Sequence, residues 1–400
     1  MQNRRLIRKL NLHFSILWSL YWIGWAALWG YLSVFLLHRG FTNSQIGLVS
    51  SCALLLPIVV QPALASLIDR SERVTSRRLA MALTALAMVC SVGVWLVENT
   101  LVSSALLIVI GVSLTATAPY FNAMSMDFVL HGLDVNFGAS RSCGSVTYAL
   151  TSLVMGRLLE HFAPTLVLPV FLVSFAALFL ALLLFRYSLP PLSFGGAKVA
   201  PAVLSNAALL RHYPRFAMML LACFLLVGSQ NAITTYMIHI ADKVGGGESI
   251  TGTAYFISGM MEMPAMLLFG KVRRKVPLRY LLLLCAAFFV FRSTAFLLAG
   301  SPLAMYFACS LQFFAYAILS ISMVYYVTEE IDTANQVKGQ ALIYTASSGM
   351  GAAFGSFCGG RLLDMGGVNT MLIFCICSAA AGLIVMTLCL FSKRLKGANV

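Results

Sequence analysis

The chain has 400 residues, of which 60% are hydrophobic and 10% are charged, and its mean hydropathy is +0.89. Soluble globular domains carry about 25% charged residues, so this composition excludes a water-soluble domain and indicates a membrane protein. The net charge of +14 does not indicate nucleic acid binding. The basic residues gather in the connections between apolar windows, where they mark the cytoplasmic side of a membrane.

Apolar windows of about 20 residues recur along the whole chain, and each is long enough to cross a hydrocarbon core of about 30 Å. Backbone amides cannot stay unpaired in lipid, so each window is expected to be a helix. The chain is therefore predicted to be an all-α polytopic protein of the inner (cytoplasmic) membrane, with both termini in the cytoplasm. The twelve predicted spans are residues 12–37, 44–67, 78–98, 101–125, 141–161, 164–186, 216–240, 250–270, 279–299, 303–327, 340–362 and 370–391.

The central connection, RYSLPPLSFGGAKVAPAVLSNAALLRHYPR, has Pro and Gly pairs and no long apolar run. It predicts an N-terminal six-helix bundle at residues 1–187, a cytoplasmic linker at 188–215 and a C-terminal six-helix bundle at 216–400. Basic turns follow the second span (ASLIDRSERVTSRR) and the eighth (GKVRRKVPLR), at the same place in each half. This repetition predicts two pseudo-symmetric bundles around a substrate cavity near the membrane midplane.

The loop after the second span resembles the signature loop of the major facilitator superfamily. Asp69 and Arg70 are followed there by Arg77 and Arg78, although Ala65 stands where Gly is common and the loop is slightly long. Three stretches resemble the lactose permease, oligosaccharide and nucleoside proton-symporter branch: VQPALASLIDR, FGASRSCGSVTYA and GQALIYTASSGMGAAFGSFCGGRLLD. The resemblance covers nearly the whole chain and implies the major facilitator fold, with Asp69 and Arg70 as a cytoplasmic gate contact.

Three residues of the fifth span, Arg141, Ser145 and Tyr148, are spaced i, i+4 and i+7 and so share one helix face. In lactose permease-like proteins the matching Arg holds sugar hydroxyls, and the aromatic residue at the Tyr148 position, usually Trp, stacks on the sugar ring. The resemblance therefore implies substrate binding by this face. The alternative is that Arg141 extends its charge to the cytoplasmic mouth and has no ligand.

A single acid, Glu262, lies in the apolar stretch FISGMMEMPAMLLFG. An ionisable side chain at mid-membrane costs about 3 kcal/mol or more unless it is paired or wetted, so Glu262 is expected to face the cavity. The resemblance implies that it accepts hydrogen bonds from substrate and pairs with Arg141 across the two bundles. The alternative is a purely structural salt bridge.

Proton coupling is implied by the resemblance for Arg292, in the ninth span, and Glu262 is the best candidate proton carrier. The sequence departs from the branch at two places. Gln312 and Ala315 stand where lactose permease has a His and a Glu that handle the proton. In the fourth span, Asn122 stands near the position where lactose permease has another sugar-binding Glu, allowing for a one-residue gap. Any coupling would therefore proceed without that His and Glu.

Further polar and aromatic residues are candidates for the substrate pocket. Amides and aromatic groups deep in a membrane seek partners, but interfacial anchoring or helix–helix hydrogen bonding explains them equally well. These further candidates are Tyr21, Trp25, Gln230, Asn231, Gln312 and Tyr316.

The predicted function is secondary active transport of a small hydroxylated solute, sugar-like or nucleoside-like, by alternating access with import coupled to protons. The alternative is a drug or metabolite exporter of the same fold. The sequence has no HExxH, GxSxG or P-loop motif, which argues against an enzyme. No cofactor or metal is expected. The expected partners are the solute, protons and the lipid bilayer, with no nucleic acid, and the protein is expected to be a monomer.

Overall fold

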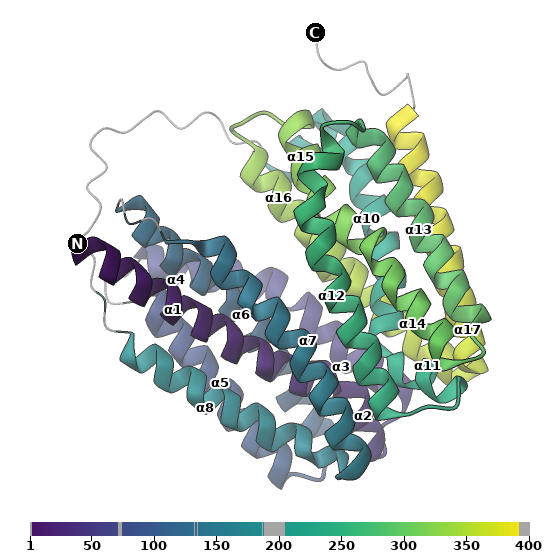
Figure 1. The fold of residues 1–400 in the computed structure, drawn as a ribbon, viewed down its shortest axis with the longest axis horizontal. Coiled ribbons are helices and arrows are strands. Elements are labelled where there is room, and N and C mark those ends of the chain that lie inside the picture. Colours follow the sequence, from purple (N-terminus) through teal and green to yellow (C-terminus); the bar gives the residue numbers. More distant parts are fainter. Residues whose placement is uncertain are drawn as a thin grey trace. The chain divides into compact units, whose positions relative to one another are not determined.

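The computed structural model describes residues 2–70, 74–131, 133, 135–185, 187 and 205–391. The regular structure in these residues is helical (Figure 1). Helices satisfy every backbone hydrogen bond within one segment, which is what a chain of this hydropathy requires in lipid. The prediction of an all-α polytopic membrane protein is confirmed.

Nine helical stretches among the described residues are long and apolar enough to cross a membrane. One of them, Gln336–Phe391, has 56 residues and covers two predicted spans. The backbone leaves helical geometry between these two spans, at Gly367 with φ = 73°. The helices α7 (Phe137–His161) and α12 (Glu248–Arg273) occupy two further predicted spans but are too polar to be among the nine. Those two helices carry Arg141 and Glu262. Together these stretches account for the twelve spans.

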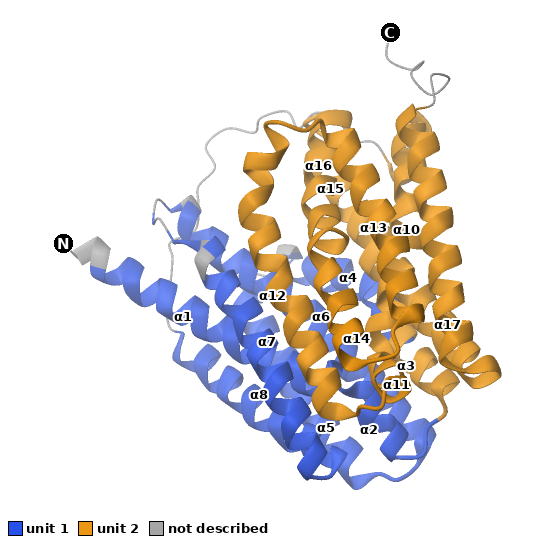
Figure 2. Ribbon diagram, turned by 45° about the vertical axis from the view of Figure 1, so that its right-hand side comes forward, with its two compact units in different colours: residues 1–41, 52–194 blue, residues 42–51, 195–400 orange. Residues whose placement is uncertain are grey.

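The chain divides into two compact units, coloured blue and orange in Figure 2. Unit 1 consists of Met1–Phe41 and Cys52–Phe194. Within it α1 packs against α7 and α8, and α5 packs against α6 and α8. Its helices are α1 (Gln2–Gly24), the π-helical turn η1 (Trp25–Trp29), α2 (Leu32–His38), α4 (Pro57–Arg70), α5 (Ser76–Leu96), α6 (Thr100–Leu130), α7, the 3₁₀ turn η2 (Pro164–Leu166) and α8 (Val167–Leu184).

Unit 2 consists of Thr42–Ser51 and Gly195–Val400, so that α3 (Asn43–Leu55) begins in this unit. Within it α10 and α13 pack against α17, and α12 packs against α14 and α15. Its other elements are α9 (Asn206–His212), α10 (Pro214–Thr235), α11 (Met237–Lys243), α12, α13 (Leu278–Leu298), α14 (Pro302–Ser310), η3 (Leu311–Phe313), α15 (Tyr316–Glu330), α16 (Gln336–Tyr344), the π-helical η4 (Thr345–Gly351) and α17 (Ala352–Phe391).

The predicted bundle boundaries remain a prediction. Unit 2 differs from the predicted C-terminal bundle because it includes residues 42–51. Residues 188–204 of the predicted linker lie outside the described residues, and the rest of the linker contains α9.

The first turn of α3 is held in unit 2 by the carboxylate of Asp364 on α17. Oδ1 accepts a hydrogen bond from the backbone N of Asn43 at 3.2 Å, and Oδ2 accepts one from the backbone N of Ser44 at 2.7 Å. A helix leaves its first N–H groups without partners, and a negative charge at this end is favourable. Asp364 supplies both the hydrogen-bond acceptors and the negative charge, and so ties the first turn of α3 to α17.

Glycines allow α10 and α17 to approach through their backbones. A methyl group at Gly355 would collide with the carbonyl oxygen of Gly228, and one at Gly351 would lie 2.6 Å from the carbonyl oxygen of Phe224. Small residues permit such approaches in membrane helices. Gly351, Gly355 and Gly359 recur every four residues in the sequence, which predicts close helix packing, and the approach of α10 agrees with that prediction.

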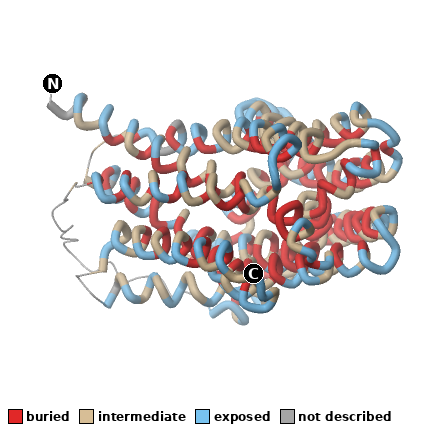
Figure 3. The backbone as a smooth tube through the Cα atoms, turned by 90° about the horizontal axis from the view of Figure 1, so that it is seen from below, coloured by how far each residue is buried: buried red, intermediate tan, exposed pale blue. Residues whose placement is uncertain are grey.

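In unit 1, Arg77 of the signature-like loop binds the end of another helix. Its Nε donates to the carbonyl of Leu182 at 2.7 Å, and its Nη2 donates to the carbonyl of Leu183 at 2.8 Å. The last carbonyls of a helix lack intrahelical partners and attract cations. Arg77 thereby fastens the start of α5 to the end of α8. Buried and exposed residues alternate along most of the helices, as Figure 3 shows, so these helices bury one face and expose the other.

Candidate functional site

Four polar side chains in unit 2 form a continuous hydrogen-bonded chain, which we call the amide chain: Glu262, Gln312, Gln230 and Arg292. Gln312 Nε2 donates to Glu262 Oε1 at 2.9 Å, and Gln230 Nε2 donates to Gln312 Oε1 at 3.0 Å. Arg292 Nη1 then donates to Gln230 Oε1. These side chains come from α12, η3, α10 and α13, so four separate elements converge on one network.

The two ends of the amide chain differ in burial. Arg292 is 2% exposed and Gln312 is 4% exposed, whereas Gln230 and Glu262 are half-buried. A buried guanidinium needs compensation. Arg292 Nε also donates to the carbonyl of Ala308 at 3.3 Å, and its guanidinium lies 5.0 Å from the ring of Phe296. Buried Arg292 thus anchors one end, and the acid at the other end is the more accessible group.

A break in the tenth span places Gln312 in this network. α14 ends at Ser310, η3 covers Leu311–Phe313, and Ala315 has φ = −86° and ψ = −94°, which is not helical. Interruptions of this kind inside a helix often mark functional positions. The break places the Gln312 side chain against Glu262 on α12, and no turn signal in the sequence predicts it.

Arg292 and Glu262 do not form a direct ion pair. Among the described residues one salt bridge lies within 4.0 Å, and it joins Arg273 to Glu329 at 2.5 Å. The two amides of the chain therefore separate the charges of Arg292 and Glu262. Nη2 of Arg292 is buried and has no hydrogen-bond partner in the part of the chain that is described.

Asn231 and Tyr316 lie outside the amide chain. Asn231 Nδ2 donates to the carbonyl of Ala352 at 2.8 Å and to Ser356 Oγ at 2.6 Å, so it ties α10 to α17. This contact favours the helix-packing interpretation of Asn231. Tyr316 is the first residue of α15 and is half-buried.

In unit 1 several aromatic residues form a second group, which we call the aromatic cluster: Trp18, Tyr21, Trp22, Trp25, Phe121 and Tyr148. Ring centroids lie 5.6 Å apart for Tyr21 and Trp22, 5.9 Å for Trp22 and Trp25, and 5.5 Å for Trp22 and Tyr148. Edge-to-face pairs at these separations are favourable. Trp25 begins the π-helical η1, a geometry that often occurs at functional sites.

Trp22 can lie against α7 because residue 144 is glycine. A methyl group at Gly144 would collide with the indole ring of Trp22. On the other side of the cluster, the hydroxyl of Tyr21 donates to the carbonyl of Leu114 on α6 at 3.0 Å. The cluster therefore joins α1, α6 and α7, with Trp22, Trp25 and Tyr148 half-buried.

Arg141 lies beside the aromatic cluster. Its guanidinium carbon is 5.3 Å from the centroid of the Trp18 ring, and the residue is exposed, as is Ser145 one turn further along α7. A cation over an indole face is attracted by the ring quadrupole. Arg141 belongs to unit 1 and Glu262 to unit 2, so their direct pairing stays a prediction.

Asn122 and the predicted gate residues occupy other parts of unit 1. Asn122 is half-buried on α6, and its Oδ1 is buried without a hydrogen-bond partner among the described residues. Arg70 is exposed at the end of α4. The side chain of Asp69 lies outside the description, and the gate role of both stays a prediction.

The aromatic cluster contains Trp18, Trp22 and Phe121, which are not among the candidates named from the sequence. Trp18 precedes Trp22 by four residues and Trp25 by seven, so one helix face carries all three. That spacing is the signal that identifies them. It does not reveal that Arg141 lies over Trp18, which depends on how α1 packs against α7.

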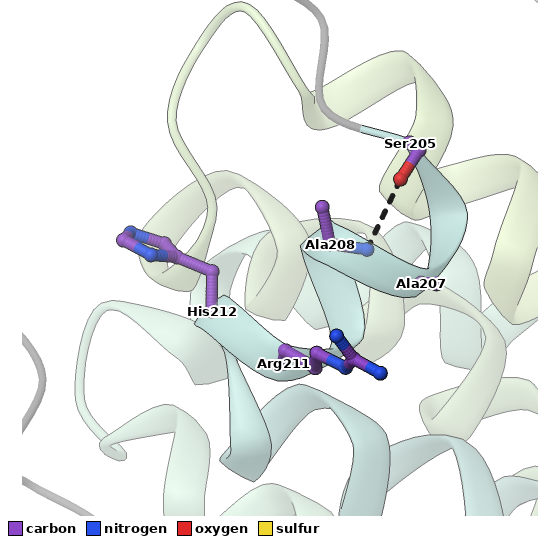
Figure 4. A pocket seen from close by; sticks show the side chains of 5 residues that line it. All are labelled: Ser205, Ala207, Ala208, Arg211 and His212. Carbon is purple, nitrogen blue, oxygen red and sulfur yellow. Dashed lines mark hydrogen bonds between the residues drawn. The ribbon is translucent and has the colours of Figure 1, made fainter.

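A surface recess of about 500 Å³ lies on α9, lined by Ser205, Ala207, Ala208, Arg211 and His212 (Figure 4). The hydrogen bond drawn there, from the backbone N of Ala208 to Ser205 Oγ at 3.2 Å, is the cap of the helix. None of the candidate residues contributes to this recess, and we assign it no role in solute binding. Within the described residues no group of three or more His, Cys, Asp or Glu could hold a metal ion.

Comparisons with known proteins agree with this architecture. A family model described as the MFS_1 like family matches residues 11–376. A maltose permease from Geobacillus stearothermophilus is 27% identical over 386 residues, which cover 95% of this chain and 94% of that protein.

Two solved structures have the same fold. The nucleoside transporter NupG matches with a TM-score of 0.80 at 17% identity, over 96% of this chain and 99% of that chain. A bacterial homolog of the human lysosomal transporter Spinster, in an inward-facing and unoccupied conformation, matches with a TM-score of 0.69 at 12% identity, over 97% of each chain. The chain belongs to the MFS_1 like family and is a transporter of the major facilitator superfamily.

Proposed function

We propose that this transporter imports a small hydroxylated solute, sugar-like or nucleoside-like, across the cytoplasmic membrane by alternating access, and that import is coupled to protons. The observation that carries this proposal is the amide chain, which ends at the half-buried residue Glu262. Polar networks inside membrane proteins are costly and mark substrate or ion pathways.

The side chains of Glu262 and Arg141 suit a hydroxylated ring. The carboxylate of Glu262 can accept hydrogen bonds from hydroxyl groups, and the guanidinium of Arg141 can donate to them. The aromatic cluster offers half-buried ring faces on Trp22, Trp25 and Tyr148, against which a sugar or a base can stack. Two of the similar proteins are named for maltose and for nucleosides, which supports the same solute classes here. The exporter alternative gains no support from the residues of either group.

Proton coupling is assigned to Glu262, positioned through the amide chain by Arg292. Glu262 is the carboxyl group at the accessible end of that network, and Arg292 keeps a fixed charge because a guanidinium does not deprotonate in proteins. We propose that protonation of Glu262 alternates with solute binding as the two halves of the molecule exchange access between the two sides.

The test is uptake by the purified protein in liposomes, after a thermal-shift screen of sugars, nucleosides, organic acids and drugs at two pH values has selected the solute. We expect Arg141→Ala and Glu262→Ala each to lower uptake at least about tenfold, which corresponds to about 1.4 kcal/mol of lost interaction. Ser142→Ala and Met263→Leu, at exposed neighbouring positions, are matched controls and should transport normally.

Normal uptake by folded Arg141→Ala and Glu262→Ala proteins would contradict the proposal. Proton coupling is read separately, as alkalinisation of the external medium when solute is added. We expect Glu262→Gln to abolish that alkalinisation, because an amide cannot carry the proton. A signal that persists in Glu262→Gln would remove Glu262 from the proton pathway.

A further inference from the structure

The amide chain has a direction, because each carboxamide has a donor end and an acceptor end. Gln230 accepts at Oε1 from Arg292 and donates from Nε2 to Gln312 Oε1 at 3.0 Å. Gln312 in turn donates from Nε2 to Glu262 Oε1 at 2.9 Å. Every donor in the chain therefore points toward the acid.

The direction is fixed by Arg292. A guanidinium has only donors, so the atom of Gln230 that meets it has to be the oxygen. If the chain were reversed, N–H groups of Gln230 and Arg292 would face each other in a buried place, and unsatisfied buried donors are costly. Gln230 Nε2 also lies 3.4 Å from Thr234 Oγ1, whose own proton is donated to the backbone carbonyl of Gln230 at 3.0 Å. This second contact favours the same orientation.

A fixed direction has a consequence for the two oxygens of Glu262. Oε1 receives an N–H from Gln312 when the carboxyl group is ionised, and it still receives one when the group is protonated, because Gln312 cannot turn its oxygen toward the acid without disturbing Gln230. The proton therefore cannot reside on Oε1 facing Gln312. The C=O oxygen of a protonated carboxyl group is a better acceptor than its OH oxygen, so the oxygen that accepts from Gln312 is the C=O oxygen and the proton resides on Oε2.

We propose that Arg292 is a positioning residue that sets the direction of the amide chain, so that Oε1 of Glu262 is a permanent acceptor and Oε2 is the atom that takes the proton and meets the solute. The part of this inference that concerns solute rests on the proposed function. The assignment of the two oxygens rests on the hydrogen bonds alone, and it holds in the absence of any solute.

The experiment is infrared difference spectroscopy of the full chain, titrated from alkaline to acidic pH without solute. The C=O stretch of protonated Glu262 is assigned as the band that Glu262→Gln removes. A carboxyl C=O that accepts a hydrogen bond absorbs at lower frequency than one that does not. We expect one band at low frequency in the wild-type protein and in Arg292→Lys, because Lys is also a donor without acceptor capacity.

Two variants release the direction of the chain. In Arg292→Met the donor is lost, and in Gln230→Leu the link between Arg292 and Gln312 is cut, so Gln312 is free to turn its oxygen toward the protonated acid. We expect the band to move to higher frequency or to split in both variants. Gln230→Leu also keeps the test available if Arg292→Met does not fold.

Ser293→Ala and Ser229→Ala are matched controls. Both hydroxyls are buried next to the amide chain, and among the described residues each bonds to a carbonyl of its own helix, at 2.9 and 2.7 Å, so the band should not move. An unchanged band in folded Arg292→Met or Gln230→Leu overturns the inference, as does a high-frequency band in the wild-type protein. Because the spectrum needs no solute, a protein that imports nothing still reports on the direction of the chain.

Discussion

The aromatic cluster of unit 1 and the amide chain of unit 2 hold their residues together by different physics. The cluster consists of rings at 5.5 to 6.0 Å with one cation over an indole face. The amide chain consists of hydrogen bonds with a defined donor and acceptor at each step. Ring contacts tolerate shifts in angle, whereas a hydrogen bond weakens steeply when its angle or distance changes.

The aromatic cluster can adapt to different ring-shaped groups, whereas the amide chain cannot. A stacking surface can accept several flat or ring-shaped groups without change in its own residues. A chain of directed hydrogen bonds leaves one defined group, the Glu262 carboxyl, available at its end. We therefore propose that the aromatic cluster determines which solutes are accepted and that the amide chain serves proton coupling.

The largest difference in stability between unit 1 and unit 2 is expected on substitution of one glycine in each, Gly144 and Gly355. Gly355 faces the backbone oxygen of Gly228, which cannot move without displacing α10, whereas Gly144 faces side-chain atoms of Trp22, which can shift without displacing a helix backbone. We expect Gly355→Ala to destabilise the protein by about 3 kcal/mol, at the upper end for overpacking. Gly144→Ala should be much milder and should instead alter the fluorescence of Trp22. Melting temperatures of the two variants in one detergent provide the measurement, and equal losses would contradict the contrast.

The second-largest effect is expected when the centre of the amide chain is removed. Gln312→Leu leaves Glu262 and Gln230 without their mutual partner, and an unsatisfied buried polar group costs about 2 kcal/mol. We expect a lower melting temperature together with a loss of uptake. The matched change is Phe313→Leu, one residue along and half-buried, which should preserve uptake. A Gln312→Leu protein with wild-type stability and uptake would show that the chain is dispensable.

The smallest effect is expected in the aromatic cluster. Trp22→Ala removes ring contacts with Tyr21, Trp25 and Tyr148, and one aromatic contact with a bound ring is worth about 1 kcal/mol. We expect the solute affinity to fall about fivefold while the maximal uptake rate stays near wild type. Trp22→Phe, which keeps a ring, should recover most of the affinity. A change in rate without a change in affinity would argue against a stacking role.

The sequence predicted the helical class and the spans because hydropathy and backbone pairing in lipid depend on local composition. It also selected Glu262, Arg292, Gln230 and Gln312 one at a time. Their order in a single chain could not be predicted, because that order depends on the break at Ala315 and on the packing of α10, α12 and α13.

In unit 1 the residues beside Arg141 show the same limit. The face shared by Arg141, Ser145 and Tyr148 follows from spacing alone, but the choice of Trp18 as the ring under the guanidinium depends on the fit between α1 and α7. The π-helical geometry at Trp25–Trp29 is likewise invisible in the sequence, since its residues have no signature that distinguishes it from an ordinary α-helix.

The backbones of α10 and α17 are in direct contact at Gly228 and Gly355. We therefore expect α10 and the part of α17 before Gly367 to move as one rigid body, so that probes on their exposed residues keep one separation. Leu221 on α10 and Phe357 on α17, exposed by 49% and 45%, are suitable attachment points. The distance between two labels at these positions is an internal reference, against which the displacement of other helices can be measured during a transport cycle.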